Sequence, residues 1–212
     1  MSKRSSSRSR PQRLDKPPSP RLPAIDLSAL TDEQQALVDA IAAGPRGMFS
    51  NSGPFAVYLH APGFGSLAQQ LGAHVRFSTS LPPRLSEFAI LCTGAYWKAQ
   101  YEWHAHAQLA AKQGVKEATI RDLQAGRAPK SAPRDEQAIY AFVKELYAKR
   151  RVSDATYARA HKLLGDRGMV ELVGTLGYYA MVSMTLNVFR MPVPPGATAP
   201  FREPAPARGK RA

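Results

Sequence analysis

A glutamate and a histidine, Glu102 and His106, lie four residues apart in the stretch Ala-Gln-Tyr-Glu-Trp-His-Ala-His (99–106). On a helix, residues at this spacing project from the same face, because each residue advances by about 100°. A second carboxylate, Glu87, belongs to the preceding helical segment and is placed to reach the same imidazole. Two carboxylates and a histidine in apolar surroundings are groups that transfer protons in general acid–base catalysis. The pattern therefore predicts a proton-transfer site, with a surface ion pair of small energetic value as the alternative.

The residues around this trio extend the prediction. His104 is two positions from both Glu102 and His106, about 200° round the helix, so it is expected to point away from their site. A metal ion held by the trio is a weaker alternative, because no further nitrogen or sulfur ligand is apparent beside the imidazole and the two carboxylates. We therefore expect neither a metal nor a cofactor.

Two tyrosines are candidates for the substrate pocket. Tyr101 is next to Glu102, and Tyr178 lies on a later apolar segment together with Tyr179. The pair Tyr178 and Tyr179 either closes the pocket or fills the core. The loop 45–54, rich in Gly, Pro and Ser, is predicted to line the same pocket.

The chain has one cysteine, Cys92. A single cysteine excludes an intrachain disulfide and any multi-cysteine metal site. Cys92 follows Leu91 on an apolar helical segment, which is typical of a buried core cysteine. A reactive thiol is the alternative, although no neighbouring group in the sequence is of a kind that would lower its pKa.

The net charge of +13 is unevenly distributed over the 212 residues. Residues 1–24 contain seven Lys or Arg and one Asp, and residues 191–212 contain four and one Glu. The remaining residues 25–190 carry 18 basic and 14 acidic side chains, so the predicted domain is only mildly basic. Both tails are rich in Pro, Ser or Arg and are predicted to be disordered. Contact of the tails with nucleic acid is a weaker expectation, because no aromatic residues alternate with the basic ones.

The segment 25–190 reads as one all-helical domain. Neither a secretory signal pattern nor a run of 18 apolar residues is found, so the protein is predicted to be cytoplasmic and without a membrane span. The last predicted helix is apolar nearly all round, which indicates burial in the domain centre or in a subunit interface. The predicted helices cover 31–43, 55–60, 64–77, 84–97, 100–112, 116–124, 134–149, 153–164 and 167–188.

The segment from Arg84 to Val115 resembles the carboxymuconolactone decarboxylase and alkylhydroperoxidase D-like (AhpD-like) family, with weaker similarity as far as Phe189. The resemblance rests on Arg-Leu-Ser-Glu-Phe-Ala-Ile-Leu (84–91), the helix ending at His106, and Ala-Gln-Leu-Ala-Ala-Lys-Gln-Gly-Val (107–115). It implies an all-α, AhpD-like helical bundle that forms a homo-oligomer, a trimer or hexamer, with the site near a subunit interface.

Peroxidase members of that family carry Cys-x-x-Cys-x-x-x-His, with a glutamate twelve residues before the first cysteine. Glu87 and His106 stand at the glutamate and histidine positions, whereas Ala99 and Glu102 replace the two cysteines. Peroxide reduction of that type needs one thiolate to attack and a second thiol to resolve the sulfenic acid. The departure argues against a thiol-pair peroxidase and favours the decarboxylase branch.

We therefore predict a cofactor-free enzyme that acts on a small organic acid or lactone by proton transfer, of the decarboxylase or lyase type. In this prediction Glu102 is the general acid or base, His106 is its proton partner, and Glu87 orients the imidazole. The alternatives are a peroxidase-related oxidoreductase using Cys92 or a partner's thiol, and a non-catalytic helical scaffold with basic tails.

Overall fold

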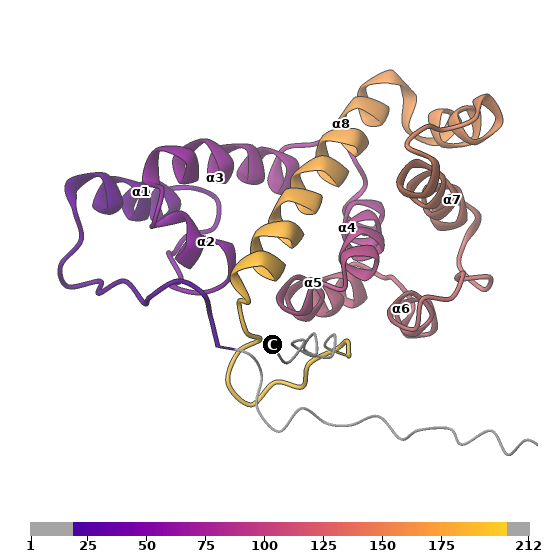
Figure 1. Cartoon of the computed structure of the whole chain (residues 1–212). Coiled ribbons are helices and arrows are strands. Elements are labelled where there is room, and N and C mark those ends of the chain that lie inside the picture. Colours follow the sequence, from indigo (N-terminus) through magenta and orange to yellow (C-terminus); the bar gives the residue numbers. More distant parts are fainter. Residues whose placement is uncertain (1–18, 203–212) are drawn as a thin grey trace, which may run out of the picture.

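The computed structural model describes residues 19–202, and within this range the chain is helical without strands, which confirms the predicted fold class. Eight helices follow one another along these residues (Figure 1). Their bounds are α1 (Asp32–Ala43), α2 (Gly53–Tyr58), α3 (Pro62–Phe77), α4 (Pro83–Trp97), α5 (Gln100–Lys112), α6 (Glu117–Gln124), α7 (Arg134–Lys149) and α8 (Asp154–Phe189). Most agree with the predicted ranges to within one or two residues.

Helix α8 is the centre of the bundle. It packs against α2, α3, α4, α5 and α7, with α1 and α3 on one side and α7 on the other (Figure 1). Gly165, at φ +63°, interrupts it, so α8 is two helical pieces, as the separate predictions 153–164 and 167–188 require. The helix is less completely buried than its composition suggested, because Val170 and Val173 are exposed.

The core is divided into three clusters of buried side chains. The largest joins α4, α5, α7 and α8 and includes Phe88, Trp103 and Phe142. A second, around Ile90 and Tyr179, lies between α4 and α8, while the third belongs to α1, α2 and α3. Ten consecutive residues of α4, 85–94, are buried, so this helix has almost no solvent-facing side over that length.

The ends of the helices follow local rules. Thr31 and Gln34 form a capping box at the start of α1, with each side chain accepting from the other's backbone N–H. Pro83 occupies the first position of α4, where its missing N–H costs no intrahelical bond. Lys98 ends α4 in the left-handed conformation, at φ +51°, and so turns the chain directly into α5.

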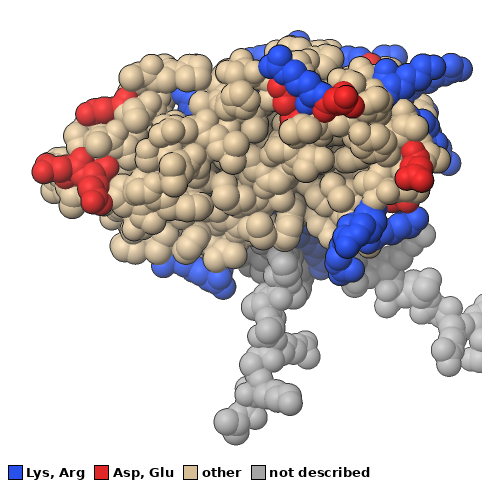
Figure 2. Space-filling view, turned by 90° about the horizontal axis from the view of Figure 1, so that it is seen from above, with Lys and Arg blue, Asp and Glu red and all other residues tan. Residues whose placement is uncertain are grey.

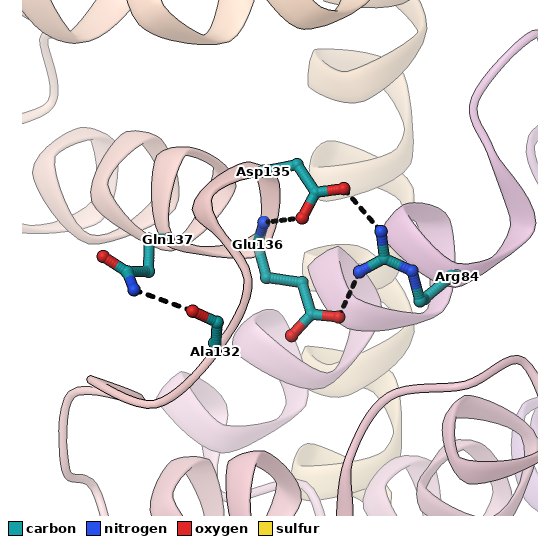
Figure 3. Close-up of polar contacts among 5 residues, drawn as sticks. All are labelled: Arg84, Ala132, Asp135, Glu136 and Gln137. Atoms are coloured by element: carbon teal, nitrogen blue, oxygen red, sulfur yellow. Dashed lines mark hydrogen bonds and ion pairs between the residues drawn. The ribbon is translucent and has the colours of Figure 1, made fainter.

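An ion-pair cluster ties α4 to α7 (Figure 3). The guanidinium of Arg84 donates to Glu136 with one terminal nitrogen and to Asp135 with the other. The Glu136 side chain is 1% exposed, and Arg84 is 29% exposed. Burial raises the pKa of Glu136, an effect that Arg84 opposes by favouring its charged form.

Residues 191–202 do not behave as the predicted disordered tail. Phe201 is buried against Trp103, with ring centroids 5.2 Å apart. The backbone N–H of Phe201 donates to Gln100 Oε1 at 2.8 Å, and its carbonyl accepts from Gln100 Nε2 at 2.7 Å. The prediction of disorder is wrong for residues 191–202, because it was based on their Pro content and took no account of the aromatic anchor Phe201. Residues 1–18 and 203–212, including most of the predicted basic tails, lie outside the described residues.

Helix α8 is long and apolar enough to meet the length and composition criteria for a membrane span, which the sequence analysis did not anticipate. The same criteria are met by core helices of soluble proteins. Here the helix carries a break at Gly165 and contacts five other helices.

Candidate active site

The predicted trio converges where α4 meets α5. Glu87 projects from the second turn of α4, and Glu102 and His106 project from the first two turns of α5. The tight turn at Lys98 and Ala99 brings the two helices together, because α5 begins only three residues after α4 ends. All three functional side chains are buried.

The imidazole of His106 lies between the two carboxylates. Its Nδ1 is 2.7 Å from Glu87 Oε2, within hydrogen-bond distance, and its Nε2 is 3.0 Å from Glu102 Oε1. The second contact is close enough for an ion pair, yet Glu102 Oε1 has no well-aligned hydrogen bond. Glu87 therefore fixes the ring, whereas the Glu102 carboxylate retains hydrogen-bonding capacity beside it.

The two carboxylates determine the charge of His106. Burial by itself would lower the pKa of the imidazole, but the negative charges of Glu102 and Glu87 and the close contacts of their carboxylates with the ring outweigh it and raise the pKa to about 9. His106 is thus an imidazolium at neutral pH, with a proton on both ring nitrogens. An imidazolium flanked by two acids is a reservoir for one transferable proton.

A cavity of about 160 Å³ opens onto Glu102 and His106. Its walls include Tyr101 and Tyr178, as predicted for these two residues, and members of the predicted loop 45–54. The hydroxyl of Tyr101 is 2.8 Å from Ser52 Oγ, which joins that loop to α5. Glu87 is not among the lining residues, which fits a group that acts through the imidazole.

Two glycines allow the tyrosines to approach. Gly53 adopts φ +57°, and a Cβ there would lie 2.5 Å from Tyr101 Cε1. A Cβ on Gly72 would lie 2.0 Å from the hydroxyl of Tyr178. Either side chain would have to move if its glycine became alanine, so both positions shape the cavity.

Sequence reasoning missed two cations of this cavity, Arg46 and Arg76. Both line it, and both guanidiniums lie near the ring of Phe77, at 5.8 Å and 5.1 Å from its centroid. Burial lowers the pKa of Arg46, and the positive charge of Arg76 lowers it further. Neither arginine has an ion pair within residues 19–202. The two residues belong to distant segments, and no spacing in the sequence connects them.

Tyr179 is a further neighbour of the imidazole. Its ring packs edge-on against His106, with centroids 5.0 Å apart, and burial raises its pKa well above the ordinary value. It therefore remains a neutral phenol. Tyr178 packs edge-on against Tyr179 and likewise has a pKa raised by burial. The two tyrosines both close the cavity and fill the core, so the two alternative predictions for the pair are compatible.

The remaining candidates lie elsewhere. His104 does not line the cavity, in agreement with its position round the helix. Cys92 is 6% exposed and lines a different cavity, and burial raises the pKa of its thiol. In the described part of the chain, no group of three or more His, Cys, Asp or Glu side chains is arranged to hold a metal ion.

Comparison with known proteins finds similarity only in three-dimensional structure. No family model matches the chain, and no curated protein does. The AhpD core of an uncharacterized peroxidase-related protein from Ralstonia eutropha JMP134 superposes with a TM-score of 0.69 at 16% identity, covering 84% of this chain and 94% of the other.

A second solved structure shows the same similarity. It is a protein of unknown function from Agrobacterium tumefaciens, with a suggested antioxidant defence role as an AhpD, and superposes with a TM-score of 0.59 at 16% identity. The match covers 65% of this chain and 95% of the other. The resemblance inferred from the sequence is therefore confirmed for the fold: residues 19–202 adopt the helical architecture of the AhpD-like proteins.

Proposed function

We propose that the protein is an enzyme that transfers a proton to or from a small organic acid or lactone, in a decarboxylation or related lyase step. The observation that carries the proposal is the buried imidazole between two carboxylates, one of which opens onto a cavity. A structural ion pair has no need of a cavity beside it. General acid–base groups of this kind contribute roughly 10²–10⁴-fold in rate.

The proposed step is a decarboxylation followed by protonation of the carbon that loses CO₂. The bond between the substrate's carboxylate and the adjacent carbon breaks, CO₂ leaves, and the electron pair stays on that carbon. The Glu102–His106 pair delivers a proton to this carbon, forming the new C–H bond, and regains one from solvent. Glu87 holds the Nδ1–H of the ring, so that Nε2 faces Glu102 throughout.

The two arginines support an acidic substrate. Arg46 and Arg76 line the cavity that contains Glu102, and they repel each other. A bound carboxylate or lactone carbonyl would relieve this repulsion and accept hydrogen bonds from guanidinium groups. The substrate would then be held at one end by arginine, with its reacting carbon toward Glu102.

The experiment is an exchange assay in D₂O, monitored by proton NMR. The protein is incubated with a panel of small acids and lactones that includes 4-carboxymuconolactone, and deuterium incorporation and CO₂ release are followed. We expect enzyme-dependent exchange or decarboxylation that is lost in Glu102→Gln and retained in the surface control Glu117→Gln. Activity that persists undiminished in Glu102→Gln would contradict the assignment.

A peroxidase-related activity is the second candidate, because the solved structures that share the fold carry peroxidase-related or antioxidant names. The chemistry would then depend on Cys92, the chain's one thiol. Consumption of hydrogen peroxide or an alkyl hydroperoxide with a thiol reductant distinguishes the two candidates. A rate that disappears in Cys92→Ser would favour the peroxidase, and a rate equal to the uncatalysed one would remove it.

We also propose that the protein is a homo-oligomer. Large apolar side chains are exposed on α3 (Phe64, Leu67 and Leu71) and on α8 (Val170 and Val173). Viewed from above, a broad area of the molecule is free of charged groups, which lie mainly at its ends (Figure 2). Exposed apolar side chains on two helices that pack against each other are typical of an interaction site. Light scattering of the wild type and of Leu67→Glu/Val170→Glu tests the proposal: a wild-type monomer would contradict it.

A further inference from the structure

A second cavity, separate from the one at Glu102, lies where the end of α4, the turn after α6, and α7 meet. Its volume is about 290 Å³, larger than that of the Glu102 cavity. Cys92 is one of its lining residues, and the two cavities share no lining residue. The apolar and aromatic side chains that line the second cavity are Ala95, Tyr96, Leu123, Tyr140, Val143 and Tyr147.

The aromatic wall is partly open to solvent. Tyr96 is 55% exposed, and its ring lies 4.6 Å from that of Tyr147. The Tyr147 hydroxyl is turned away from solvent toward Thr93, at 3.0 Å from Oγ1, so the ring rather than the hydroxyl is presented to the cavity. Burial raises the pKa of Cys92, and the thiol therefore remains neutral and forms part of the apolar surface.

The charged residues of this cavity are all basic: Lys98, Arg127 and Lys144. Arg127 forms an ion pair with Asp122, with nitrogen–oxygen distances of 2.7 and 3.0 Å. The ammonium groups of the two lysines instead lie over aromatic rings, Lys98 at 4.9 Å from Phe201 and Lys144 at 5.9 Å from Tyr140. Neither lysine has a carboxylate partner within residues 19–202. The cavity thus combines an apolar interior with unneutralised positive charge.

We propose that this cavity is a binding site for a small monocarboxylate with an aromatic or branched aliphatic body. The body would lie between Tyr96 and Val143, above Cys92, while the carboxylate would reach Lys98 and Lys144. Ligand sites are typically apolar clefts of about 300 Å³ or more with few polar groups that fix orientation, and this cavity is at the lower end of that range. It therefore suits a one-ring acid, and the lysines favour an anion over a neutral molecule of equal shape.

The test uses 3-phenylpropionate as the probe and its neutral amide as the matched ligand, titrated into the ¹⁵N-labelled full chain. We expect amide shifts at Gly126 and Val143, with a Kd on the order of 0.1–1 mM for a ligand of this size. The amide should bind about tenfold more weakly or worse, since it lacks the charge. The double variant Lys98→Gln/Lys144→Gln should lose affinity by a similar factor, and Lys149→Gln should not.

Two further variants locate the site. Ala95→Phe fills the cavity and should abolish the shifts, with its fold checked by circular dichroism. His106→Gln leaves this cavity intact and should bind the probe as the wild type does, so failure of the proposed reaction and failure of this site are separable. Absence of shifts at 5 mM probe, equal affinity for the amide, or unchanged affinity in the double lysine variant would overturn the proposal.

Discussion

Two clusters that each include one residue of α4 contain the same kinds of charge but differ in what they can do. In each, one cationic side chain lies between two carboxylates: His106 between Glu87 and Glu102, and Arg84 between Asp135 and Glu136. Arg84 and Glu87 are one turn apart on α4. Arginine keeps its proton at every relevant pH, whereas histidine can release one. The first cluster can therefore take part in proton transfer, and the second can only hold helices together.

The surroundings reinforce this difference. In the histidine cluster, Glu102 lines a cavity. The His106 ring is held by its hydrogen bond with Glu87 and by packing against Tyr179. The arginine cluster joins α4 to α7 through Glu136, whose side chain is almost fully buried (Figure 3). Burial of a carboxylate in an ion pair is compatible with either role, so access to a cavity and the ability to titrate are what distinguish them.

The largest expected effect separates the clusters by activity. Glu102→Gln or His106→Gln should lower turnover about 10²- to 10⁴-fold, because the transferable proton is lost. Arg84→Met should leave turnover per folded molecule within about threefold of the wild type, because Arg84 has no part in the proposed proton transfer. The measurement is the D₂O exchange assay on purified, folded variants. Comparable losses of turnover in the Arg84 and His106 variants would contradict the functional difference between the two clusters.

The second effect separates them by stability. Arg84→Met leaves Glu136 buried without its partner and should reduce the free energy of unfolding by about 2–4 kcal/mol, somewhat less than for a fully buried pair because Arg84 is partly exposed. Urea denaturation gives the value. The exposed pair Arg121–Glu117 is the matched control, and Arg121→Met should change stability by less than about 1 kcal/mol. A loss no larger than this in Arg84→Met would contradict the structural role.

The third effect is the pH dependence of stability. The pKa of His106 is raised in the folded protein from 6.5 to about 9. Its stabilising contribution is therefore fully present below pH 6.5 and is lost as the pH rises toward 9, a change of about 3 kcal/mol. Denaturation midpoints between pH 6 and pH 9.5 measure this loss. The slope should be absent in His106→Gln and retained in His104→Gln.

The smallest effect concerns the arginines that face the histidine cluster. Arg46→Gln or Arg76→Gln should raise KM about tenfold for an acidic substrate, with little change in kcat, because the arginines are proposed to hold a carboxylate or carbonyl that does not react and is bound equally in the ground and transition states. Steady-state kinetics on the best substrate of the panel measures both constants. A change in kcat alone would indicate that the arginine acts on the reaction and not on binding.

The sequence was sufficient for the parts of the fold and site that depend on local spacing. The capping box at Thr31, the break between the two pieces of α8 near Gly165, and the meeting of Glu102 with His106 each follow from residues a few positions apart. The contact with Glu87 was predicted from its place on the preceding helical segment, and the family resemblance supported it, because this contact joins two helices.

Features that depend on distant segments could not be predicted. Arg46 and Arg76 meet at the cavity only because α3 and the loop before α2 fold against α5 and α8. No local pattern in the sequence indicates that Phe201 packs against Trp103, so the sequence predicts a disordered tail at this position. The Arg84 cluster was missed for the same reason, its partners being some fifty residues away.

The most direct test of the account is the protonation state of His106. Long-range ¹H–¹⁵N NMR spectra of the imidazole, recorded from pH 5 to pH 10 with His106→Gln for assignment, report both ring nitrogens. We expect an imidazolium at pH 7 that loses a proton near pH 9. A ring that is neutral at pH 7, with one unprotonated nitrogen, would contradict the proposed proton reservoir.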